Sequence, residues 1–132
     1  MPAITRRELV LGAIFTLTGM PTVSSHWPSL RTVGRWVRGL FSDAALAAHL
    51  GAVYLEGRPE ERSAARLAEA LFGSELSQQL DRAALDRLTR RLRAGRARDF
   101  HNDDLVVVGG WVLTRTEARL LGLVSLSRDL SV

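Results

Sequence analysis

The sequence predicts a mainly α protein: a small bundle of about four helices after an N-terminal signal or anchor helix, with one β-hairpin at about 104–113 before the last helix. Three observations support this class. Several stretches repeat apolar residues at three- and four-residue spacing, as one face of a helix does. Two β-branched runs flank a pair of glycines, and apolar residues make up 46% of the chain, enough for a small core.

Residues 1–25 have the order of a signal peptide. Thr5-Arg6-Arg7-Glu8-Leu9-Val10 matches the twin-arginine motif of Ser or Thr, two arginines, any residue and two apolar residues. The apolar run 9–20 is shorter than the roughly 20 residues that span a bilayer. Arg6 and Arg7 are therefore the predicted export signal, followed by a candidate cleavage site at 23–25. An uncleaved anchor, or an ordinary helix with a chance arginine pair, remains an alternative.

Residues 26–132 form the predicted single domain, which opens with an amphipathic helix over 28–41. Arg31, Arg35 and Arg38 lie opposite an apolar face that includes Trp36. That face has two interpretations: it packs on the protein core, or it lies on an anionic membrane surface.

The middle of the chain predicts three more helices. Ser42 or Asp43 caps the first, which runs over 44–56 and stops at Gly57. The second helix is predicted to start with residues 58–61 as its first turn and to end at Gly73, and the short connection favours antiparallel packing of these two helices. Ser74 or Ser77 opens the third, which ends at Gly95 or runs on to Phe100.

The C-terminal third carries the most consistent local signals. Runs 105–108 and 111–113 flank Gly109-Gly110, which suits a type I′ turn because both of its central residues need positive φ. Thr114 and Glu117 have the spacing of a capping box, and the helix that follows is apolar on most sides. Trp111 is interpreted as a core anchor and Glu117 as a cap, with ligand contact as the alternative for both.

The stretch DF…VVVGGWVLTRTEARLLGL also carries a resemblance. It resembles the C-terminal signature of small, uncharacterised bacterial proteins that begin with a twin-arginine leader, and the likeness covers the leader and about the last third of the chain. The resemblance implies a compact exported helical domain. It supplies no catalytic residue.

Charge is segregated along the chain. All 18 basic residues are arginines, and residues 82–98 hold seven of them against one aspartate. This stretch is a candidate contact for an anionic partner or membrane surface, with an ordinary solvated helix face as the alternative. The candidate residues are Arg82, Arg87, Arg90, Arg91 and Arg93. Nucleic acid is not expected, because few aromatic residues are interleaved and no recognition motif is present.

Catalytic chemistry is not predicted. The chain has no cysteine, which excludes disulfides and thiolate nucleophiles. His101 lies near Asp103 and Asp104, but no second cluster completes a metal site. Gly109-Gly110 precedes a strand and so fails the dinucleotide-binding pattern. We therefore expect no catalytic, cofactor-binding or metal-binding residue and no enzymatic activity.

Two functional hypotheses remain. The first is a non-catalytic accessory or assembly subunit of a cell-envelope complex, in which a larger protein partner supplies the chemistry. Small leader-bearing subunits of membrane-bound sugar and polyol dehydrogenases are a precedent for a redox complex, by leader and size alone. The alternative is a membrane-surface or anionic-ligand binding module that uses the arginine-rich helices. A cytoplasmic regulator would require the leader to be misread.

Overall fold

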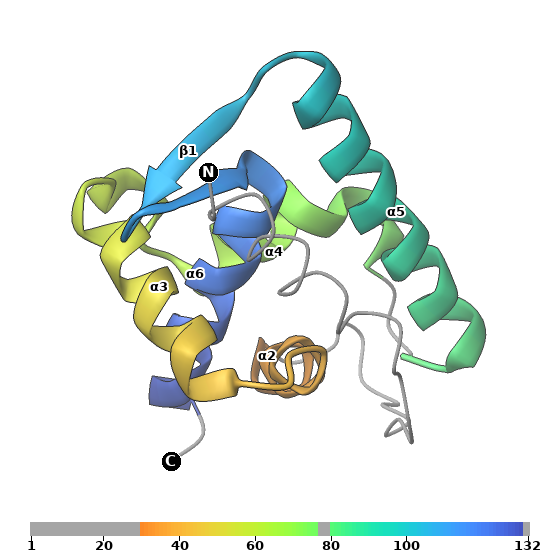
Figure 1. Ribbon diagram of the computed structural model, residues 1–132. Helices are drawn as coiled ribbons and strands as arrows, with labels where there is room; N and C mark the ends of the chain where they lie inside the picture. Colours follow the sequence, from red (N-terminus) through yellow and green to blue (C-terminus); the bar gives the residue numbers. More distant parts are fainter. Residues whose placement is uncertain (1–29, 77–79, 131–132) are drawn as a thin grey trace.

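Helix α6 (Arg115–Leu130) lies at the centre of the fold, and the other elements surround it (Figure 1). The structure is a computed structural model and describes residues 30–76 and 80–130. In chain order, the elements before α6 are α2 (Leu30–Gly39), α3 (Ala44–Glu56), the 3-10 turn η2 (Pro59–Glu61), α4 (Ala64–Phe72), the 3-10 turn η3 (Gly73–Glu75), α5 (Arg82–His101), β1 (Leu105–Val108) and β2 (Trp111–Thr114). The predicted class, mainly helical with one hairpin before the last helix, is confirmed.

The sequence of α6 explains its central position. Its apolar residues occupy most of the helix surface, so it must be covered from several sides. Leu120, Leu121, Leu123 and Val124 are all fully buried. Each such side chain contributes about 1.5–3 kcal/mol when it leaves water, so burial of α6 contributes substantially to stability. Contacts come from α3, α2, α4 and α5.

Helix α3 packs on α6 through small residues. Asp43 caps α3, since its Oδ1 accepts a hydrogen bond from the N–H of Leu46 at 3.0 Å. Ala47, Ala48 and Gly51 are buried. A flat face of this kind lets two helix backbones approach closely, so α3 packs mainly on α6. We predicted that α3 and α4 pack mainly against each other. This prediction is wrong, because α3 and α4 each pack chiefly on α6.

Two predicted helix starts are also wrong. Residues 59–61 form a separate 3-10 turn, and α4 begins after Ser63, whose hydroxyl accepts the N–H of Arg66 at 3.3 Å. Helix α5 begins after Asp81, whose carboxylate accepts the N–H of Ala84 at 2.8 Å. Ser74 lies in η3, and Ser77 falls outside the described residues. In both helices, a capping side chain closer to the apolar stripe provides the N-terminal hydrogen bond.

Helix α5 continues through Gly95 to His101, as the longer of the two predicted alternatives required. Gly95 is needed there for close packing, because a Cβ at this position would lie 2.9 Å from the hydroxyl oxygen of Thr116 in α6. The C-terminus of the helix leads through Asn102 into the hairpin, and Asp103 takes a positive φ of 58°. This turn carries the chain from α5 into β1.

The apolar face of α2 belongs to the core. Val33, Trp36 and Val37 are 0%, 4% and 0% exposed, and the Trp36 ring lies 5.8 Å from the ring of Phe72. Arg38 reaches back to α6, where its Nη2 donates to the Ser127 hydroxyl at 3.2 Å. Of the two interpretations of this helix, the structure shows packing on the core.

The hairpin and its cap follow the local sequence. Strands β1 and β2 pair antiparallel with Val108 opposite Trp111, and Gly109 and Gly110 have φ values of 54° and 84°. Trp111 is 9% exposed and belongs to the hydrophobic core.

In the part of the chain that the structure describes, no helix is long and apolar enough to cross a membrane.

The capping box at the start of α6 is present and fully buried. The Thr114 hydroxyl oxygen accepts the N–H of Glu117 at 3.1 Å, while Glu117 Oε2 accepts the N–H of Thr114 at 2.6 Å. The Thr114 hydroxyl also donates to Oε2 at 2.9 Å. Arg96 of α5 lies 3.6 Å from Glu117 Oε1 and balances the charge of this buried carboxylate.

Candidate anion-binding cleft

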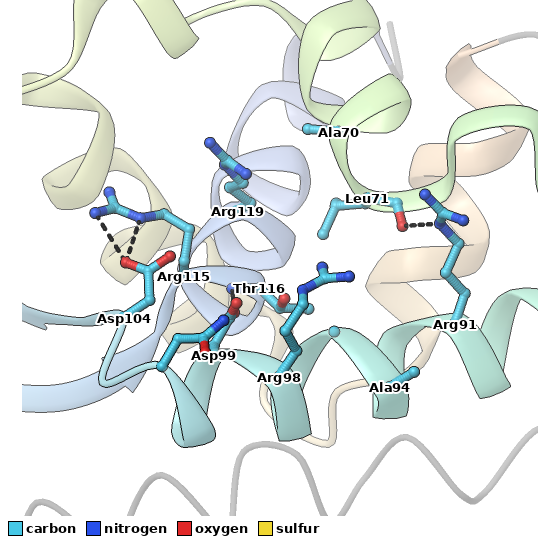
Figure 2. A pocket seen from close by; sticks show the side chains of 12 residues that line it. Ala70, Leu71, Arg91, Ala94, Arg98, Asp99, Asp104, Arg115, Thr116 and Arg119 are labelled. Atoms are coloured by element: carbon cyan, nitrogen blue, oxygen red, sulfur yellow. Dashed lines mark hydrogen bonds and ion pairs between the residues drawn. The ribbon is translucent and has the colours of Figure 1, made fainter.

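A cleft of about 300 Å³ lies where α4, α5 and the first turns of α6 meet. Its lining is unusually rich in arginine, with two residues from α5 and two from α6 (Figure 2). The lining residues are Ala70 and Leu71 of α4; Arg91, Ala94, Gly95, Arg98 and Asp99 of α5; Asn102 and Asp104 of the following turn; and Arg115, Thr116 and Arg119 of α6. This volume is at the lower end of the range of small-ligand pockets, about 300–1,000 Å³.

Arg91 is anchored at one end of the cleft. Its Nε donates to the carbonyl oxygen of Leu71 at 3.1 Å, near the C-terminus of α4. The last carbonyls of a helix have no partner within it, and a cation beside them is favourable. Gly73 permits this approach, because a Cβ there would lie 2.9 Å from Nη2 of Arg91, and its φ of +53° also suits glycine. Within residues 30–76 and 80–130, the two Nη groups of Arg91 have no hydrogen-bond or ion-pair partner and can bind a ligand.

Arg98 lies on the same side of α5, seven residues and therefore about two turns further along. Figure 2 shows its side chain rising from α5 between Arg119 and Arg91. The Arg98 side chain is exposed to solvent. Within residues 30–76 and 80–130, its guanidinium has no hydrogen-bond or ion-pair partner. It is therefore available to a ligand in the cleft.

Arg115 and Arg119 are already paired with carboxylates. Arg115 Nη2 lies 3.3 Å from Asp104 Oδ1, and Arg119 Nε lies 2.9 Å from Glu61 Oε1. These contacts neutralise the two arginines of α6. The uncompensated positive charge of the cleft therefore comes from α5.

Tyr54 of α3 holds the α6 end of the cleft in place. Its hydroxyl donates to the Glu61 carboxylate at 2.9 Å and accepts from Arg115 Nη1 at 3.3 Å. Burial raises the pKa of Tyr54, and this outweighs the opposing effect of the Arg115 hydrogen bond. The same hydrogen bond raises the pKa of Arg115. Tyr54 thus remains a neutral donor that links the two ion pairs.

The N-terminus of α6 is closed to ligands by protein atoms. The N–H of Arg115 donates to the Asp104 carbonyl oxygen at 3.1 Å, and the N–H of Thr116 donates to Asp99 Oδ2 at 2.7 Å. The next N–H is held by Thr114 in the capping box. The buried Asp99 carboxylate occupies the position that an anion would take at a free helix N-terminus. An anion in this cleft must therefore bind through the arginine side chains.

The predicted arginine set is divided by the structure. Arg91 lines the cleft, whereas Arg87 lies 3.7 Å from Glu75 in a solvent-exposed ion pair. Arg82, Arg90 and Arg93 are exposed and do not line the cleft. The five residues follow one another along a helix and consequently point in different directions around it.

Of the four cleft arginines, only Arg91 was among the five named candidates, although the predicted contact stretch 82–98 also contains Arg98. Arg98 could have been found from its seven-residue spacing to Arg91, which places both on one side of a helix. Arg115 and Arg119 come from α6, and no local pattern relates them to α5.

The remaining predictions on sites concern the leader and metals. Arg6 and Arg7 lie outside the described residues, so the export signal has no structural description here. His101 is exposed at the end of α5. Among the residues that the structure describes, no group of three His, Cys, Asp or Glu side chains is placed to hold a metal ion.

Comparison of the chain with protein-family models, with curated proteins and with solved structures gives no match.

Proposed function

We propose that this protein is a non-catalytic accessory or assembly subunit with an anion-binding cleft. In this proposal the twin-arginine route exports it to the periplasm or to the periplasmic face of the inner membrane. There it joins a larger protein partner in a cell-envelope complex, of which a redox complex is one candidate. The motif around Arg6 and Arg7 supports the export route. The proposal assigns the chain no cofactor, no metal and no nucleic acid.

The observation that carries the binding role is the charge of the cleft. Arg91 and Arg98 line it, and neither has a carboxylate partner among the described residues. Two unneutralised guanidinium groups in one concave site attract an anion, and their N–H groups can bind it directly. The hydrogen bond from Arg91 to the Leu71 carbonyl oxygen orders this side chain before a ligand binds. Binding therefore loses less conformational entropy at Arg91.

Packing of α2 supports an anionic ligand rather than a membrane surface as the binding partner. Val33, Trp36 and Val37 are buried, so the apolar face that would enter a membrane is engaged in the core. Membrane insertion of α2 would require this face to leave the core and would expose the core residues that it covers, among them Phe72. The cleft needs no such rearrangement, and this favours the anionic-ligand form of the alternative hypothesis.

Anion binding can be tested on the purified full chain with sulfate as the probe. We expect sulfate to raise the thermal unfolding midpoint in a concentration-dependent manner, since a ligand of the native state stabilises it. Arg98→Gln should abolish most of this rise. Arg82→Gln is the matched control, because it removes the same charge from the same helix outside the cleft. Equal responses in the two variants would exclude specific binding in the cleft.

The accessory role needs a separate test. The full chain, tagged at its C-terminus, should co-purify from the membrane fraction with a stoichiometric larger protein. Recovery of the tagged chain alone, under mild extraction and at native expression level, would contradict the role of an accessory subunit. The outcome is independent of the sulfate experiment, so each half of the proposal can fail by itself.

A further inference from the structure

We infer that the cleft between α4, α5 and α6 recognises the dianion of a phosphate monoester. The inference rests on the proposed function of this cleft as an anion site, and it names the chemical class of the anion.

Charge balance is the first argument. The ion pairs Arg115–Asp104 and Arg119–Glu61, at 3.3 and 2.9 Å, contribute no net charge. The Asp99 carboxylate accepts a hydrogen bond from the N–H of Thr116 and lies at the positive end of the α6 dipole. Arg91 and Arg98 remain without a carboxylate partner among the described residues, so the lining stays net positive. A phosphate monoester carries about −1.5 to −2 at neutral pH and can pair with both guanidinium groups, whereas a single carboxylate pairs with one.

Donor geometry is the second argument. Arg91 uses Nε for the Leu71 carbonyl, which leaves its two Nη groups, and all five N–H groups of Arg98 are free of partners among the described residues. Both arginines come from α5 and line the same cleft. A phosphate offers three terminal oxygens in three directions and can accept hydrogen bonds from two guanidinium groups. A carboxylate offers two oxygens in one plane and suits a single fork.

Two further polar residues of the cleft indicate what carries the phosphate. Asn102 and Asp104 also line it, and Asp104 uses Oδ1 for Arg115. These side chains can accept hydrogen bonds from hydroxyl groups. Because Arg115 already neutralises Asp104, this carboxylate does not require a cationic group on the ligand. A volume of about 300 Å³ admits a small hydroxylated phosphate. The same chemistry occurs in a soluble phosphate monoester and in the headgroup of phosphatidate.

The test uses calorimetric titration of the full chain with glycerol 3-phosphate and, as a matched carboxylate, glycerate. We expect glycerol 3-phosphate to bind at least about tenfold more tightly, since a charge-assisted bond is worth about 1.5–3 kcal/mol. Arg98→Gln and Arg91→Gln should each weaken binding by about tenfold or more, with Arg82→Gln unchanged. Circular dichroism checks that the variants fold, which is expected because Arg98 is exposed and without a partner in the described part of the chain.

A pH comparison tests the dianion without any variant. The second pKa of a phosphate monoester is about 6, so binding should weaken by about tenfold between about pH 7.5 and pH 5. Inorganic sulfate stays a dianion over this range, and its binding should change little. The described residues that line the cleft include no histidine, so the fall belongs to the ligand. A parallel loss of sulfate binding would overturn this reading.

Vesicles distinguish the two sources of the phosphate. If the headgroup is the ligand, vesicles containing phosphatidate should bind the chain more tightly than vesicles of phosphatidylglycerol, whose phosphate is a monoanionic diester. Equal binding to the two vesicles and no preference for glycerol 3-phosphate over glycerate would overturn the assignment to phosphate monoesters. In that case Arg98-dependent sulfate binding would still support the proposed anion cleft, whereas the failure of every anion to bind would remove both.

Discussion

Gly51 of α3 lies against the backbone carbonyl of Leu121 in α6, so closely that a Cβ at Gly51 would overlap the carbonyl group. The neighbouring Ala47 and Ala48 are buried on the same helix. Small residues therefore set the distance between α3 and α6, the two helices with the most extensive contact in the fold. Because the obstacle is backbone, no rotamer change can relieve it.

Gly51→Ala should lower the free energy of unfolding by about 3 kcal/mol, since the two backbones must separate and the core between them loosens. Gly57→Ala is the control, because no atom lies within 4 Å of a Cβ at that position and its φ of −87° suits any residue. Its effect should stay within about 1 kcal/mol. Denaturant unfolding followed by circular dichroism measures both, and comparable losses would contradict the close approach.

Thr114→Val should cost about 1–2 kcal/mol of stability. The substitution removes the acceptor of the Glu117 N–H inside the core, where water cannot replace it. Ser63→Ala removes an equivalent cap from α4 at an exposed bond and should cost less, about 0.5–1 kcal/mol. Denaturant unfolding of both variants tests whether a buried capping hydrogen bond contributes more to the free energy of unfolding than an exposed one. A larger loss for Ser63→Ala would argue against it.

Tyr54 is the single tyrosine of the chain, so its ionisation can be followed directly by ultraviolet absorbance. Burial raises its pKa above the usual value of 10.0. The folded protein should therefore titrate above pH 10.0, and the unfolded chain in denaturant should titrate at the usual value. A folded midpoint at or below the denatured one would show that Tyr54 is not buried as described.

The same shift predicts how stability depends on pH. A folded-state pKa above the unfolded value means that the folded protein holds its proton longer. The stability contributed by Tyr54 is then fully present below the unfolded value of 10.0 and is lost as pH rises through the folded value. Tyr54→Phe should flatten this alkaline fall in the free energy of unfolding.

The predicted leader can be tested apart from the domain. A fusion of residues 1–30 to a folded reporter should be exported, and replacement of Arg6 and Arg7 by lysine should keep the reporter in the cytoplasm although the charge is unchanged. Thr5→Ser is the matched control, because the motif accepts either residue. Failure of the unaltered leader to export the reporter would favour a cytoplasmic protein.

Local patterns predicted elements well where one short stretch held all of the information. The glycine pair, the capping-box spacing and the apolar helix after it lie within residues 105–126, and each has its partner within a few residues. The starts of α4 and α5 were less predictable. Several Ser and Asp residues near these starts can cap a helix. Asp81 is the residue that caps α5, and the packing of α5 against the core determines this choice.

The candidate site shows the same division. Arg91 was predicted from the charge of its helix, but its bond to Leu71 and its separation from Arg82 depend on the position of α5 beside α4. Arg115 and Arg119 join the cleft from a helix that starts 14 residues after α5 ends. The charge of the sequence predicted contact with an anion, while the tertiary contacts determine which arginines are already neutralised.

Short stretches of sequence were enough to predict the helical class, the hairpin, the cap of α6 and the excess of arginine on one helix, because propensity, turn chemistry and capping act over a few residues. The packing of both α3 and α4 on α6, and the cleft that Arg91 and Arg98 share with two neutralised arginines, follow instead from contacts between distant segments. Such relations depend on where distant backbones meet, and that is set by the sum of many small packing contacts.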